Sequence, residues 1–235
     1  MNKIRHWLAA MCCTLFVPAL VFAGEDPVLL LEKQEPSLFR LYQSYSNQLP
    51  ELDRYVFRQG FTAPFERLAA RVHELIHIDS FEHQGFYVDG IYYEPYLKRE
   101  AWPVLDNGDI QGELPAEGPV FNAYVRRNPK NHLGNVLDEI NAYTQVLPFV
   151  CLNEPASAAK QITNLTAFLV VEEVYLHKLH ESALAEYTEF ENNKASRGAL
   201  LLITQRAYTA LDRCGVTGRY PRLERDRFAS GKDGF

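Results

Sequence analysis

The chain has 235 residues, with 24 basic and 30 acidic side chains and a net charge of −6 at neutral pH. This acidic balance argues against nucleic acid or an anionic membrane as the main partner. The length allows one domain with a sizeable hydrophobic core.

The first 23 residues are typical of a secretory signal peptide. Lys3 and Arg5 precede an apolar run over residues 7–21, and Ala23 stands where a signal peptidase cuts. The run is too short to span a membrane comfortably, and no later stretch is apolar enough to do so. We therefore expect a secreted or periplasmic protein whose mature part, residues 24–235, is a single domain without stable membrane insertion.

Only two cysteines remain after removal of the leader, Cys151 and Cys214. In an oxidising compartment such a pair is expected to form one disulfide. A zinc site built on both thiols would need further ligands close by in sequence, and there are none.

Helical periodicity begins early in the mature chain and returns around residue 62. Residues 24–60 predict an irregular start followed by helix, with a second helical piece opened by Pro50. Another helix is expected to begin between residues 62 and 65, with Thr62 as a capping residue and Pro64 in the first turn. Gly85 predicts its end.

The middle of the chain is expected to contain strands. Residues 86–88 and 91–93 are β-prone triplets joined by Asp89-Gly90, which predicts a tight hairpin. A loop rich in Pro, Gly and Asp follows over residues 102–119. The alternation in residues 120–127 predicts another short strand beside the hairpin.

The rest of the sequence is predominantly helical. A helix over residues 131–147 is expected to end at Pro148, and helical patterns cover residues 156–191 and 195–213. The predicted fold class is therefore α+β, predominantly helical, with a small sheet or hairpin and a helical C-terminal part over residues 152–235.

The helix that starts near residue 62 carries the motif His73-Glu74-Leu75-Ile76-His77, or H-E-x-x-H. Residues four apart project from the same helix face, so His73 and His77 can bind one zinc ion. Glu74 can then act as general base toward a water molecule on the metal. A third protein ligand is needed, and two residues compete for that place.

Glu139 is the first candidate, because it lies within the apolar face of the helix over residues 131–147. A carboxylate there is costly unless it is paired or binds a metal. Asp138 points about 100° away and is expected to be solvated. The motif followed by Glu139-Ile140-Asn141-Ala142-Tyr143 resembles the gluzincins, zincin-type zinc metallopeptidases whose third ligand is a Glu on a later helix. The resemblance rests on about ten residues and implies a zincin-like core.

His83 is the second candidate, since His73, His77 and His83 have the ligand spacing of the metzincins. Ser80 stands where that family has Gly, and the mature chain lacks the methionine that the family places under its metal. The gluzincin resemblance implies zinc ligands His73, His77 and Glu139, with Glu74 as catalytic base.

The sequence thus predicts a zinc metallopeptidase that binds one zinc ion and hydrolyses peptide bonds of a peptide or protein substrate. Hydrolysis of an amide in cell-wall peptide would use the same chemistry. The alternative is a non-catalytic extracytoplasmic binding protein with a structural zinc site.

Overall fold

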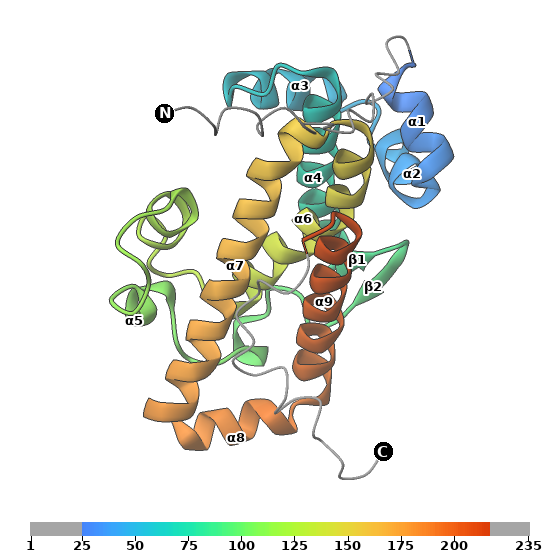
Figure 1. The fold of residues 1–235 in the computed structure, drawn as a ribbon. Coiled ribbons are helices and arrows are strands. Elements are labelled where there is room, and N and C mark those ends of the chain that lie inside the picture. The colour runs from blue at the N-terminus through green and yellow to red at the C-terminus, as the bar shows by residue number, and fades with distance from the viewer. Residues whose placement is uncertain (1–24, 217–235) are drawn as a thin grey trace, which may run out of the picture.

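The computed structural model describes residues 25–216, so the predicted signal peptide and residues 217–235 lie outside the described residues. The first part of the chain forms α1 (Pro27–Gln34), α2 (Pro36–Ser44), α3 (Leu49–Arg58), α4 (Pro64–His83), β1 (Phe86–Val88) and β2 (Ile91–Tyr93). Further along lie η1 (Arg99–Ala101), α5 (Asn107–Ile110), η2 (Phe121–Val125), α6 (Leu133–Asn153), α7 (Pro155–Ser182), α8 (Leu184–Asn192) and α9 (Lys194–Arg213). The fold is mostly helical with one two-stranded antiparallel hairpin in the described part (Figure 1). No described helix is long and apolar enough to cross a membrane.

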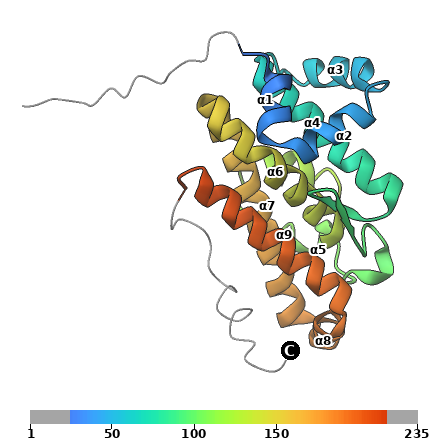
Figure 2. The same ribbon diagram turned by 90° about the vertical axis from the view of Figure 1, so that its right-hand side faces the viewer.

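Helix α6 is the central element of the fold. It packs against α4, α7 and α9 (Figures 1 and 2). Most of its residues are buried. Val136 and Ile140 belong to one core cluster, shared with α7 and α9. Val146 and Phe149 belong to a second cluster, shared with α1 to α4. Burial of each such side chain stabilises the fold by about 1.5–3 kcal/mol, so α6 is fixed on several sides at once.

Helix α4 has the bounds that the sequence predicts, but its ends are formed by other residues. The N-cap is Ala63, which makes no side-chain capping bond, in place of Thr62. The Glu66 N–H donates instead to a carboxylate oxygen of Glu154, at 3.0 Å. At the other end Gln84, with φ +52°, takes the left-handed conformation expected for Gly85.

The hairpin forms as predicted and is anchored to α6. Its register pairs Phe86 with Tyr93, Tyr87 with Tyr92 and Val88 with Ile91. The turn residues Asp89 and Gly90 both have positive φ, as a type I′ turn requires. The carbonyl of Tyr87 accepts bonds from Asn141 and Gln145 of α6, at 2.9 and 2.6 Å.

The strand predicted over residues 120–127 is wrong, because Phe121–Val125 is a π-helical turn. Phe121 and Val125 are both buried and lie about one turn apart, so a helical turn places both in the core. The apparent alternation did not reflect strand pairing.

The prediction that α6 ends at Pro148 is also wrong. Proline removes one backbone hydrogen bond from a helix interior, yet α6 continues to Asn153. Phe149 and Val150, both almost fully buried, follow the proline, and burial of these side chains offsets the missing bond. The pattern over residues 156–191 is divided at Ala183 into α7 and α8.

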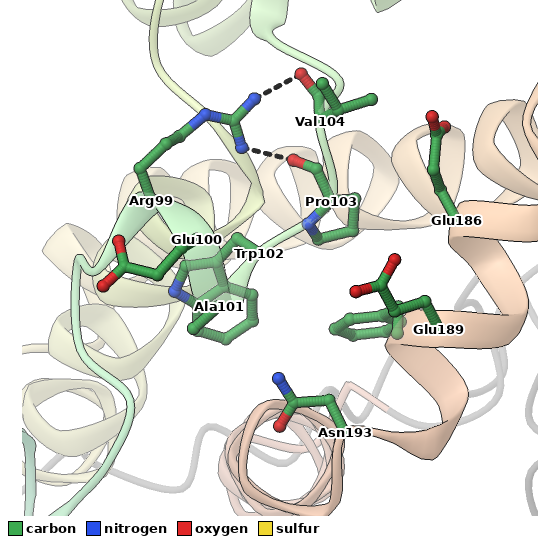
Figure 3. Close-up of a pocket in the computed structure, with 10 residues that line it drawn as sticks. Arg99, Glu100, Ala101, Trp102, Pro103, Val104, Glu186, Glu189 and Asn193 are labelled. Carbon is green, nitrogen blue, oxygen red and sulfur yellow. Dashed lines mark hydrogen bonds between the residues drawn. The ribbon is translucent and has the colours of Figure 1, made fainter.

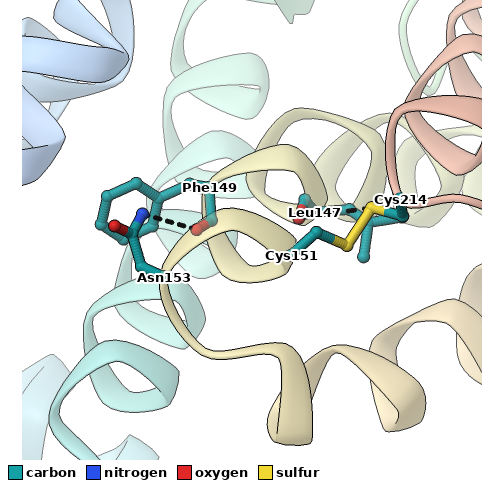
Figure 4. Close-up of a disulfide and its surroundings, with 5 residues drawn as sticks. All are labelled: Leu147, Phe149, Cys151, Asn153 and Cys214. Atoms are coloured by element: carbon teal, nitrogen blue, oxygen red, sulfur yellow. Dashed lines mark hydrogen bonds between the residues drawn. A yellow bond between two sulfur atoms is a disulfide. The ribbon is translucent and has the colours of Figure 1, made fainter. Parts of the chain in front are cut away.

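The predicted disulfide is present and joins Cys151, in the last turn of α6, to Cys214, just after α9 (Figure 4). The two Cα atoms are 5.6 Å apart, and the bond closes a loop of 63 positions. A crosslink over this length stabilises the folded state by about 4 kcal/mol in the chain-entropy model. It holds α9 against the part of α6 that follows Pro148.

Candidate metal centre

The site lies where α4 packs against α6. His73 and His77 project one turn apart from α4, and Glu139 reaches them from α6. Nε2 of His73 and Nε2 of His77 are 3.1 Å apart. Oε2 of Glu139 lies 3.5 Å from Nε2 of His73 and 3.8 Å from Nε2 of His77. Within residues 25–216 these three side chains form the group of potential metal ligands, with ligand atoms within 4.8 Å of one another.

The spacing of these atoms fits a tetrahedral metal ion. Zinc binds His nitrogen and carboxylate oxygen at about 2.0–2.2 Å, which separates neighbouring tetrahedral ligand atoms by about 3.4 Å. The three observed separations bracket this value. Two imidazole nitrogens and a carboxylate oxygen also form a donor set that zinc favours. The residues present therefore fit a zinc ion.

Asp138 orients the second imidazole. Its Oδ2 lies 2.7 Å from Nδ1 of His77 and accepts a 2.9 Å hydrogen bond from the hydroxyl of Tyr96. A carboxylate at Nδ1 favours a proton on that atom, which leaves the Nε2 lone pair directed at His73 and Glu139. Tyr96 is held in turn, since its carbonyl accepts a bond from the indole N–H of Trp102 at 2.6 Å.

The prediction that Asp138 is solvated is wrong, because its exposed fraction is 8%. The helical wheel placed it correctly about 100° from Glu139, but α6 is buried on that side too. Gly134, Ala142 and Gln145 surround Asp138 on the wheel and are also buried. These small or uncharged residues on the same face of the helix are the sequence signal that could have indicated that other elements cover this face.

Charges at the site favour a cation between the ligands. Burial of His77 lowers its pKa, because it opposes a positive charge. The carboxylates of Asp138, Glu139 and Glu74 have a larger, opposite effect and raise the pKa of His77 to about 10. Burial would raise the pKa of Glu139, but its hydrogen bond to His73 and the two nearby imidazoles lower it. The carboxylates that favour a proton here favour a divalent ion at the same position.

Glu74 is half-buried beside the ligand group. Its charge contributes to the raised pKa of His77, and it is the largest cause of a raised pKa at Tyr55 of α3, followed by burial and Glu139. Tyr55 therefore lies within electrostatic reach of both carboxylates. Its position was not evident from the sequence, where it belongs only to a helical pattern.

Tyr143, one turn after Glu139, contacts the first imidazole. Its ring meets that of His73 edge to face, with centroids 4.5 Å apart. The hydroxyl of Tyr143 accepts a 3.0 Å hydrogen bond from the side-chain amide of Asn164. Ring contact and hydrogen bond together fix one side of the His73 side chain.

His83, the rival third ligand, lies outside the group. Its ring stacks on Tyr92 with centroids 4.3 Å apart, and its Nδ1 donates to the Asp79 carbonyl at 3.0 Å. Helix α4 continues through Ser80 to His83, so the break that would turn His83 toward the metal does not occur. The structure brings Glu139, and not His83, to the two motif histidines.

A cavity of about 320 Å³ lies beside Trp102 (Figure 3). The guanidinium of Arg99 donates hydrogen bonds to the carbonyl oxygens of Pro103 and Val104 there, and α8 contributes Glu189 to the wall.

The indole of Trp102 packs so closely on Gly134 that a Cβ at that glycine would lie 2.6 Å from Nε1 of Trp102. Trp102 therefore fixes the loop that carries Tyr96 against the start of α6.

Comparisons with protein-family models, with curated proteins and with solved structures found no match to this chain. We therefore infer the function from the geometry of the site.

Proposed function

We propose that this protein is a zinc metallopeptidase that hydrolyses peptide bonds, with one zinc ion held by His73, His77 and Glu139. The observation that carries the proposal is the convergence of two imidazole nitrogens and one carboxylate oxygen from two helices, with Glu74 beside the first ligand. The ligand set is that of a gluzincin-like site, and we propose a zincin-like core on this basis.

Three protein ligands are typical of catalytic zinc, whereas structural zinc sites are closed by four. Within the described residues no fourth His, Cys, Asp or Glu joins the group. This difference favours the peptidase over a binding protein with a structural zinc site.

Each residue of the site would have a separate task. A zinc ion held here supplies a Lewis acid that polarises a carbonyl and favours deprotonation of water. Glu74 accepts the proton of the attacking water and passes it to the nitrogen of the leaving amine. Asp138 keeps His77 in the required tautomer, and Tyr143 limits the movement of His73.

We also propose an extracytoplasmic location, either secreted or periplasmic. The disulfide between Cys151 and Cys214 supports it, because such bonds persist in oxidising compartments. A peptide or protein is the proposed substrate, and the net negative charge supports neither nucleic acid nor an anionic membrane as a partner.

The direct test is Glu74→Gln, assayed on a library of quenched fluorescent peptides together with zinc analysis. The variant should keep its zinc but lose at least about 100-fold in activity, since general base catalysis contributes about 10²–10⁴-fold. Glu66→Gln, on the same helix but outside the ligand group, serves as the matched control and should remain active. Unchanged cleavage by Glu74→Gln would rule out the mechanism.

Chelation separates the peptidase from the alternative. A catalytic zinc can be removed with loss of activity while the protein stays folded. A structural zinc contributes folding free energy, so its removal would lower the melting temperature sharply.

A further inference from the structure

A second cavity, with polar walls, lies away from His73, His77 and Glu139 and is lined by residues of α9, α6, the start of α2 and the hairpin turn. Its volume is about 510 Å³. Sites for small molecules usually have about 300–1,000 Å³, so this cavity has room for an organic ligand. Thr144, which lines it, lies five residues after Glu139, and this places it about 140° around α6 from the metal ligand.

Charges of both signs line this cavity. Arg206 and Arg213 come from α9, Glu35 from the start of α2, and Asp89 from the hairpin turn. Arg206 and Asp89 are already paired at 2.7 Å. Glu35 and Arg213 make no hydrogen bond through their side chains and no ion pair with any described residue. Within residues 25–216, one negative and one positive group therefore stay available to a ligand.

The electrostatics indicate that these charged groups act on one another across the cavity. Burial and Asp89 raise the pKa of Glu35, while Arg213 and Arg206 oppose the shift. All three partners line the same cavity. A ligand with a cationic and an anionic end would complement Glu35 and Arg213 at once, whereas a singly charged ligand would satisfy only one of them.

The walls favour a polar occupant. Two of their atoms, Thr144 Oγ1 and Arg206 Nε, are buried without a hydrogen-bond partner in the described structure. Buried polar groups are rarely left unpaired, because each unmade bond costs about 1–3 kcal/mol. The cavity is also bordered by Gln205 and Thr209, which can bond to the amide of a peptide.

We infer that this cavity binds a small zwitterion, namely a short unblocked peptide. The ligand's ammonium group pairs with Glu35 and its carboxylate with Arg213, while the side-chain amide of Gln205 and the hydroxyl of Thr209 bond to the peptide link between them. This binding does not require the metal group to be catalytic. If the proposed peptidase activity is correct, the ligand has the chemistry of its reaction products.

The test uses calorimetric titration of the full mature chain carrying Glu74→Gln, so that hydrolysis does not consume the ligand. The probe is Ala-Ala, and the comparison is acetyl-Ala-Ala-amide, which has the same peptide link without the end charges. The free dipeptide should bind at least about tenfold more tightly, as expected for the loss of charge-assisted bonds at both ends. Equal binding of the two compounds, or no detectable binding of Ala-Ala up to about 10 mM, would overturn the inference.

Variants locate the binding site. Glu35→Gln and Arg213→Gln should each weaken Ala-Ala binding by about tenfold, while Glu32→Gln, at an exposed position one turn earlier, should not. Glu139→Ala removes a proposed metal ligand and should leave binding unchanged. If Glu139→Ala abolishes it and Glu35→Gln does not, the dipeptide binds at the metal group and the cavity is not its site. Circular dichroism checks that each variant is folded.

Discussion

The contact between Asp138 and His77 gives the sharpest prediction about the metal group. Asp138→Asn keeps the size of the side chain but removes its charge and one of its two acceptor oxygens. The amide oxygen of an asparagine can take the place of Oδ2, which accepts from the His77 and Tyr96 donors at 2.7 and 2.9 Å, but it carries no negative charge, so both hydrogen bonds become weaker. His77 then loses the negative charge that favours a proton on Nδ1 and makes Nε2 a stronger ligand.

The expected loss is about 10- to 100-fold in zinc affinity, or about 1.4–2.8 kcal/mol. Competition between the protein and a chromophoric chelator measures it. Tyr96→Phe, which keeps the carboxylate but removes one of its donors, should cause a smaller loss in the same direction.

Asp79→Asn is the matched control for this experiment. Asp79 is also buried and accepts bonds from two tyrosine hydroxyls, those of Tyr45 and Tyr92, but it does not contact a metal ligand's ring. The variant should lose stability and keep its zinc affinity. Equal zinc affinities for the wild type and Asp138→Asn, or an equal loss in Asp79→Asn, would refute the orienting role of Asp138.

Two further predictions concern stability. Burial raises the pKa of Glu172 to about 8, opposed by its hydrogen bond from Thr204, so the folded state holds a proton that the unfolded state releases near pH 4.5. The contribution of Glu172 to stability is therefore complete below pH 4.5 and is lost as the pH rises through 8. In urea titrations at pH 9, Glu172→Gln should be more stable than the wild type by on the order of 5 kcal/mol. At pH 4 the two proteins should be equally stable. The double variant Cys151→Ala, Cys214→Ala should have a melting temperature about 10 °C lower in scanning calorimetry, as expected for a loss of about 4 kcal/mol of stability. A reductant should not lower the melting temperature of this variant further. A wild-type stability that does not fall relative to Glu172→Gln above pH 6, or an unchanged melting temperature in the double variant, would contradict these assignments.

Local patterns predicted those parts of the fold that depend on neighbours in sequence. The hairpin follows from two β-prone triplets around Asp89-Gly90, and the helix that carries His73 follows from its periodicity. The sequence also predicts Glu139 as a ligand, because a carboxylate within an apolar helix face needs a partner, and the structure places it beside the two histidines.

The remaining features depend on contacts between distant segments. Asp138 is covered because other elements pack around α6 on that side, and its partner Tyr96 is 42 positions away with no local pattern linking them. The helix continues past Pro148 because the residues after it are buried against other helices. A helical wheel gives the direction of each side chain but does not show which directions other elements cover.

The central claim is that His73, His77 and Glu139 hold one metal ion, and metal analysis tests it most directly. Purified mature protein, saturated with zinc and then desalted, should retain about one zinc per chain. Glu139→Ala should lose most of it, and His83→Ala should retain it in full. Undiminished zinc in Glu139→Ala would contradict the proposed ligand set, as would loss of zinc in His83→Ala.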